Sequence, residues 1–187
     1  MRVFISRPQK TDVAELHHLF NIVITDAFKQ DGIGDDTAGI ETEVNKQLSF
    51  INKDLQSDGK TLFFLLARTA QQIVGTIAYS EASNLLKKHL DVDLQNVPEI
   101  TSVQVLPTFQ NKGIGSLLFN AILISLLHKN TREVCLDGGY KKSQGYWIKK
   151  LGDPNVILEN YWGDGLDHMI WYRKMTDLKI VYKFGGV

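Results

Sequence analysis

The chain has 187 residues, of which 43% are hydrophobic and 22% are charged, as in an ordinary globular domain. This composition excludes a disordered segment, a collagen-like repeat or a coiled coil as the main content. The 21 basic and 21 acidic residues balance, which disfavours nucleic acid as a partner, because a polyanion binder normally carries a basic excess.

No stretch reaches the roughly 18–20 apolar residues that a membrane helix needs, and the first ten residues lack the apolar core of a secretory signal. Cys135, the only cysteine, has no partner for an internal disulfide. The scattered histidines predict no metal site. We therefore expect a cytoplasmic protein without membrane contact. A homodimer remains an open alternative for its assembly.

Hydrophobic periodicity predicts a strand and two helices, then a strand hairpin and a less regular, polar connection with one amphipathic patch. In chain order these are residues 3–5, 13–27, 37–55, 61–68 with 73–80, and 81–97. A strand, an apolar helix, a strand, a short helix and a final hairpin follow. They occupy residues 99–105, 113–129, 133–136, 143–151, and 156–161 with 168–175.

Hairpins combined with one strand–helix–strand crossover predict an α/β fold with a mixed, mostly antiparallel sheet flanked by helices. No linker divides the chain, so we expect one domain over residues 1–187. Residues 178–187 are expected to be a C-terminal tail, with residues 178–184 as a candidate edge strand.

The most informative segment leads from the strand at 99–105 through a glycine-containing loop into the apolar helix. Backbone N–H groups at a helix start form an anion site, which the helix dipole strengthens. Gly113 and Gly115 would let phosphate oxygens approach the backbone closely, and Lys112 would add positive charge. The loop therefore predicts a pyrophosphate site, with an ordinary strand-to-helix turn as the alternative.

Two other nucleotide-binding motifs match this loop only in part or not at all. Gly113 and Gly115 resemble the start of a dinucleotide-binding fingerprint, and Asp137 ends the next strand, but Leu118 occupies the third glycine position. A Walker A loop is excluded because no Gly-Lys-Ser/Thr follows at the required spacing.

The segment resembles motif A of the GNAT superfamily of acetyl-CoA-dependent N-acetyltransferases, whose pattern is Val-x-Pro-x-x-Gln/Arg-x-x-Gly-x-Gly/Ala. The matching residues are Val105, Pro107, Gln110, Gly113 and Gly115. The element order over residues 1–175 resembles that family as well. The resemblance implies a sheet that splays between the strands at 99–105 and 133–136, with acetyl-CoA as cosubstrate.

The resemblance also implies which residues bind the cosubstrate. Backbone amides of the loop would hold the pyrophosphate of CoA; they belong to Gln110, Asn111, Lys112, Gly113, Ile114, Gly115 and Ser116. The backbones of Val103 and Val105 would pair with pantetheine, and the Val105 N–H would stabilise the developing oxyanion.

Transfer to an amine requires a base, because an alkylammonium has a pKa near about 10. Glu99 begins the motif A strand, where several relatives place a catalytic glutamate, and Glu81 is a weaker candidate. Relatives also place a tyrosine in the last short helix as general acid. Ile148 occupies that position here, so Tyr146, two residues earlier, becomes the candidate acid, with Trp147 as the alternative.

We therefore expect an N-acetyltransferase acting on a primary amine of a small molecule or peptide by direct attack in a ternary complex. Acidic residues of the opening helices and aromatic residues of the last hairpin would line the acceptor site. They are Asp26, Asp31, Asp35, Asp36, Glu41 and Glu43, with Tyr161, Trp162, Trp171 and Tyr172. The alternatives are a non-catalytic acyl-CoA-binding sensor on the same fold and a dinucleotide-dependent oxidoreductase.

Overall fold

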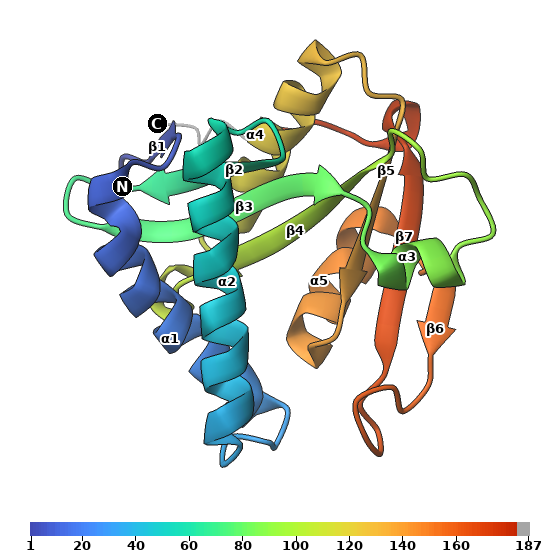
Figure 1. Cartoon of the computed structure of the whole chain (residues 1–187), viewed down its shortest axis with the longest axis horizontal. Coiled ribbons are helices and arrows are strands. Elements are labelled where there is room, and N and C mark those ends of the chain that lie inside the picture. Colours follow the sequence, from blue (N-terminus) through green and yellow to red (C-terminus); the bar gives the residue numbers. More distant parts are fainter. Residues whose placement is uncertain (183–187) are drawn as a thin grey trace.

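A computed structural model describes residues 1–182 and shows one seven-stranded sheet in the order β1-β2-β3-β4-β5-β7-β6 (Figure 1). The strands are β1 (Phe4–Ser6), β2 (Leu62–Arg68), β3 (Ile73–Glu81), β4 (Pro98–Val105), β5 (Glu133–Gly138), β6 (Val156–Leu158) and β7 (His168–Lys174). Within the described residues β4 and β5 pair in parallel, and every other neighbouring pair is antiparallel. The predicted mixed, mostly antiparallel sheet is confirmed.

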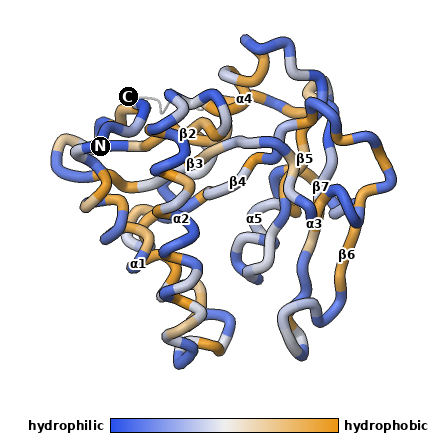
Figure 2. The backbone as a smooth tube through the Cα atoms, viewed as in Figure 1, coloured by the Kyte–Doolittle hydropathy of each residue, from blue (hydrophilic) through white to orange (hydrophobic). Residues whose placement is uncertain are grey.

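Helices cover both faces of this sheet. They are α1 (Val13–Gln30), α2 (Thr37–Ser57), α3 (Asn84–His89), α4 (Ile114–His128) and α5 (Lys141–Leu151). In Figure 1, α1 and α2 lie in front of the sheet and α4 lies behind it, where Phe119 of α4 packs against Trp147 of α5. Figure 2 shows hydrophobic and hydrophilic residues alternating along α1 and α2, as expected for helices with one buried face.

Two sequence predictions need correction. The connection over 81–97 is not irregular throughout, because it contains α3, whose Leu86 joins Leu90, Leu94 and Cys135 in a small apolar cluster of its own. The edge strand predicted over 178–184 is not present in residues 178–182, and residues 183 and 184 lie outside the described part. That segment is instead fixed to α4, since Asn120 Nδ2 donates to the Val181 carbonyl at 2.7 Å.

The centre of the sheet opens between β4 and β5. Their pairing is limited to Glu99 with Cys135 and Ile100 with Leu136, and beyond that point the strands separate (Figure 1). A bulge in β4 accompanies the separation: Ser102 has a positive φ of 52°, and the register with β3 shifts there. The buried Thr76 hydroxyl donates to the Ser102 carbonyl at 2.7 Å and holds the bulge.

Candidate active site

The loop after β4 is shaped by local hydrogen bonds and left-handed residues. A 3₁₀ turn at Pro107–Phe109 follows the strand, and the Gln110 side chain folds back to donate from Nε2 to the Val105 carbonyl at 3.0 Å. Asn111 and Gly113 both take positive φ, 58° and 83°. Glycine tolerates this conformation without strain, which explains Gly113 directly before α4.

The start of α4 presents free backbone donors. The first backbone hydrogen bond of the helix runs from the Leu117 N–H to the Gly113 carbonyl, so the N–H groups of Ile114, Gly115 and Ser116 precede it. A Cβ placed on Gly113 would meet no described atom within 4 Å, and no side chain caps the helix. Such an open helix start, with three converging N–H groups, suits a phosphate.

The edge of β4 that faces the gap also carries free backbone groups. The Leu106 N–H donates to the Val74 carbonyl of β3 at 3.0 Å. Because backbone groups alternate in direction along an antiparallel pair, the N–H and carbonyl of Val105 point away from β3, toward β5. No described strand pairs with β4 there, and the Val105 carbonyl accepts from the Gln110 side chain, so the Val105 N–H is the group of that residue left for a ligand.

Glu99 lies on the sheet face covered by α1, α2 and α3, at the point where β4 and β5 separate. Its residue is only 6% exposed, and its Oε2 accepts a hydrogen bond from the Ser83 N–H at 2.6 Å. Burial and, to a smaller extent, the charge of Asp137 raise the pKa of Glu99, and the Ser83 hydrogen bonds and Lys46 of α2 lower it, so that the net result is a pKa of about 7. A carboxyl group with this pKa can exchange protons at neutral pH.

A polar cluster that the sequence did not predict lies beside Glu99. Asp137, on β5, has its Oδ2 3.1 Å from Nε2 of the buried His168 on β7. The indole of Trp162, in the β6–β7 loop, donates to His168 Nδ1 at 2.9 Å. The sequence indicates Asp137 only as the acidic residue of a possible dinucleotide-binding site, and His168 belongs to no motif.

Tyr146 lies on the opposite face of the sheet, against the start of α4. A Cβ on Gly115 would be 3.6 Å from its hydroxyl, which is buried and has no hydrogen-bond partner among the described residues. Burial raises the pKa of Tyr146, with the Ser116 side chain opposing this. The hydroxyl therefore keeps its proton at neutral pH, next to the free backbone donors of the loop.

Several residues predicted for the site have other positions. Trp171 is fully buried and its indole donates to the Gly152 carbonyl at 2.9 Å, so it belongs to the core and not to an acceptor wall. Trp147 is likewise buried against Phe119. Glu81, the second candidate base, is exposed to solvent at the end of β3. Asp36 caps α2 by accepting from the Gly39 N–H at 2.9 Å.

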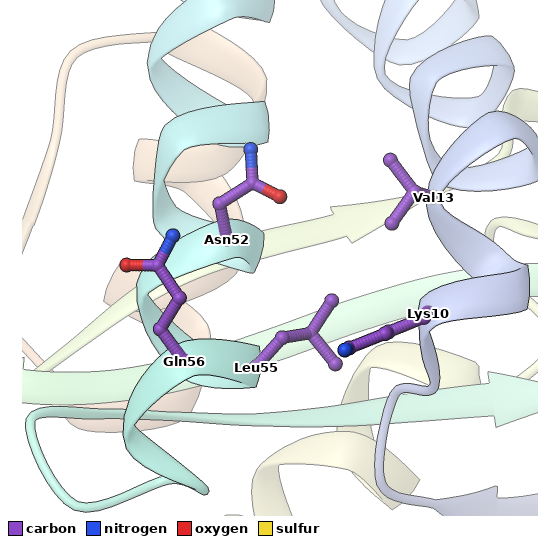
Figure 3. Close-up of a pocket in the computed structure, with 5 residues that line it drawn as sticks. All are labelled: Lys10, Val13, Asn52, Leu55 and Gln56. Carbon is purple, nitrogen blue, oxygen red and sulfur yellow. The ribbon is translucent and has the colours of Figure 1, made fainter.

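A groove of about 450 Å³ separates the start of α1 from the end of α2, lined by Lys10, Val13, Asn52, Leu55 and Gln56 (Figure 3). It lies at the far end of both helices from the α1–α2 loop and brings no reactive group together. Within residues 1–182 no group of three potential metal ligands gathers, and no helix is long and apolar enough to cross a membrane.

The comparisons with known proteins identify the family. The profile described as "Acetyltransferase (GNAT) family" matches residues 34–152, more than half of the chain. The chain therefore belongs to the GNAT family of acetyltransferases. No match is found among curated protein sequences.

Solved structures share the fold at low sequence identity. PaiA N-acetyltransferase from Thermoplasma acidophilum, in complex with coenzyme A, is 19% identical with a TM-score of 0.66, over 93% of this chain and 99% of that chain. A spermidine N-acetyltransferase SpeG chimera from Vibrio cholerae and hSSAT is 14% identical with a TM-score of 0.63, over 94% and 97%. The ribosomal-protein-S18-alanine N-acetyltransferase from Escherichia coli is 14% identical with a TM-score of 0.61, over 93% and 94%.

The raised pKa of Glu99 predicts a pH-dependent cost to stability. The folded carboxyl holds its proton up to about pH 7, whereas the unfolded carboxyl releases it near the ordinary glutamate pKa of 4.5. This group's contribution to the free energy of unfolding therefore falls as pH rises through that window, by at most about 3 kcal/mol. Glu99→Gln lacks the ionisation, so its stability relative to wild type should increase between about pH 4 and pH 8 in urea unfolding. A constant difference across this range would contradict the assignment.

The Ser83 N–H is predicted to hold the carboxylate of Glu99. Ser83 has φ −66°, which proline can adopt, so Ser83→Pro removes the N–H donor while keeping the backbone angle. Loss of this hydrogen bond should raise the pKa of Glu99, measured by the ¹³C shift of its carboxyl group in an NMR titration. Ser83→Ala is the matched control, because it also loses the capping hydroxyl but keeps the N–H. Equal pKa values in the two variants would show that the N–H has no such role.

Proposed function

We propose that this protein transfers the acetyl group of acetyl-CoA to a primary amine of a small molecule or peptide, by direct attack in a ternary complex. The observation that carries the proposal is the open helix start at Gly113, joined through the free edge of β4 to the buried carboxyl of Glu99. Together these features would place a phosphate, an extended chain and a base along one path through the sheet.

The fit to CoA rests on the space and donors of this chain. The N–H groups of Ile114, Gly115 and Ser116 would bind the pyrophosphate, together with the backbone of Gln110, Asn111 and Lys112. Bound acetyl-CoA supplies a thioester, whose acetyl group is activated toward an amine. The Val105 N–H, directed into the gap, would stabilise negative charge on the thioester oxygen during attack.

Glu99 would act as the general base of the reaction and Tyr146 as its general acid. An amine attacks only when it is neutral, and Glu99, with its pKa of about 7, would take the proton directly or through water. Tyr146 lies on the other face of the sheet with a protonated, unpaired hydroxyl, and it would donate to the leaving thiolate. Base and acid would thus act from opposite sides of the gap.

The acceptor side carries negative charge. Asp31 follows the end of α1. Partial burial and then the charges of Glu43 and Asp31 raise the pKa of Tyr140, which packs against Phe28 with ring centroids 6.0 Å apart. These carboxylates favour a cationic amine. The neighbours named for spermidine and for a ribosomal-protein alanine support both kinds of acceptor, a small-molecule amine and an amine of a polypeptide.

The two alternative functions make different predictions. A dinucleotide-binding fold requires a parallel sheet around the glycine loop, and the antiparallel pairing of β4 with β3 argues against it. An acyl-CoA sensor remains the competing proposal on this fold. Thermal-shift screening with acetyl-CoA, CoA, NAD and NADP, followed by a broad amine panel, separates them. Stabilisation by CoA without turnover of any amine would favour the sensor.

The cofactor loop is tested by adding a charged side chain to it. Gly113→Glu and Gly115→Glu should abolish CoA binding in isothermal titration calorimetry, because side chain and charge both enter the phosphate site. Gly32→Glu is the matched control for Gly113→Glu, since Gly32 also has a positive φ of 80° and open space around it. The control should bind CoA like wild type. Unchanged CoA affinity in a folded Gly113→Glu protein would refute the site.

The base is tested by the rate and its pH dependence. Glu99→Gln should lower kcat by about 10²–10⁴-fold at neutral pH, with partial recovery at high pH where free amine is abundant. CoA affinity should stay within a few-fold of wild type, because Glu99 is not in the phosphate loop. Full activity of the variant at every pH would place the base elsewhere.

A further inference from the structure

Two carboxylates stand on either side of the point where the sheet opens. Glu99 is opposite Cys135 in the parallel register, and Asp137 follows two residues later on the same face of β5. The strands separate beyond that pair, so Asp137 has no partner residue on β4 and flanks the start of the gap. The effect of its charge on the pKa of both Glu99 and Cys135 is consistent with this placement.

Asp137 lies beside a pair of hydrogen-bonded rings, those of His168 and Trp162. Trp162 donates its indole N–H to His168 Nδ1, so Nδ1 is an acceptor and the proton of the neutral ring lies on Nε2. That Nε2 is buried, makes no hydrogen bond of good geometry with the described residues, and lies 3.1 Å from Asp137 Oδ2. A Cβ on Gly139 would come within 3.0 Å of the indole nitrogen, so the glycine leaves room for the rings.

We propose that Asp137 is a second functional carboxylate of the acceptor site, which binds the ammonium group of the acceptor beside Glu99, with His168 and Trp162 as its positioning residues. This inference rests on the proposed acetyl transfer and specifies its substrate class: alkylamines that arrive as cations. Asp137 is about one quarter exposed at its side chain, so it can be reached from solvent while its orientation is fixed.

Asp137 and Glu99 would have different roles in this site. Asp137, in contact with solvent and His168, is the anion that attracts the ammonium group. Glu99, buried and close to Asp137, then accepts a proton from the ammonium nitrogen. The freed electron pair on nitrogen forms the bond to the acetyl carbon, and the carbon–sulfur bond breaks. The second proton of the nitrogen passes to the leaving thiolate, with Tyr146 as the proposed relay, and Glu99 releases the first proton to solvent. Within the described residues the pKa of Glu99 is also lowered by Lys46 of α2 and by the Ser83 hydrogen bonds before α3, and Glu99 in turn raises the pKa of Cys135 of β5.

Steady-state kinetics of Asp137→Asn test the proposal. For an alkylamine, KM should rise by about 10-fold or more, because a partly buried charge partner is lost. The acid limb of the kcat/KM profile should move by about 0.5 pH unit or more to lower pH, because the negative charge that raises the pKa of Glu99 is gone. For an aromatic amine, which is uncharged at neutral pH, KM should change far less.

The positioning role is tested with matched variants at His168 and Trp162. His168→Gln can still present an N–H to Asp137 and should keep most of the affinity for alkylamines, whereas His168→Ala should resemble Asp137→Asn in KM. Trp162→Phe keeps the ring but loses the indole donor, and should raise KM less than His168→Ala does. A purely structural role would change thermal stability without changing the preference for cationic over neutral amines.

The outcomes separate this inference from the proposed function. If wild type binds CoA but acetylates no amine, the proposed function fails and this inference fails with it. If wild type acetylates alkylamines and Asp137→Asn keeps the same KM and the same acid limb, the proposed function stands and Asp137 has no such role.

Discussion

The separation of β4 from β5 is the constraint on which the candidate active site depends. A strand that paired along its full length would leave neither free backbone groups nor room in the sheet. Here the parallel pairing stops after Ile100, and the left-handed Ser102 turns the rest of β4 away. The Thr76 hydroxyl stabilises that turn from the neighbouring strand, so β3 determines the opening as much as β4 does. The loop, the free edge and the carboxylates all face this opening.

The opening places a buried acid in a position that reduces stability. Glu99 is enclosed by α3 and its connections. Because its pKa is about 7, the carboxyl is ionised in a large fraction of the molecules at neutral pH, although little solvent reaches it. The Ser83 hydrogen bond and Lys46 offset only part of this cost. The core around it is extensive, with Phe20, Phe64, Phe119 and Trp171 fully buried on the two faces of the sheet. The stability that this core supplies offsets the cost of the buried Glu99 carboxyl group.

The sequence predicted those parts of the molecule that depend on local patterns. Alternation and helical periodicity located nearly every element. The spacing from Val105 to Gly115 located the strand-to-helix loop that we propose for CoA, because backbone geometry at a helix start follows from nearby residues. Its predictions failed where a distant segment decides the outcome. Trp171 reads as a surface aromatic until α5 covers it, and α3 is too short and polar for its pattern to be distinguished from a loop.

The cluster of Asp137, His168 and Trp162 could not be predicted for the same reason. Its three members come from β5, β7 and the β6–β7 loop, and they meet only because β7 pairs with β5 out of sequence order. Taken singly, an aspartate, a histidine and a tryptophan at these positions carry no pattern that indicates a shared site. Glu99, by contrast, was predicted from its place in the motif, although its burial by the α3 connection was not.

The connection that carries α3 links local flexibility to chemistry. The Ser83 N–H that holds Glu99 belongs to this segment between two strands and not to the sheet, and the segment is anchored mainly by one small apolar cluster. Short helices of this kind open more readily than central strands. Each opening would admit water to the carboxylate and make it a weaker base for that interval. The exchange rate of the Ser83 amide proton thus reports how readily this segment opens and exposes Glu99.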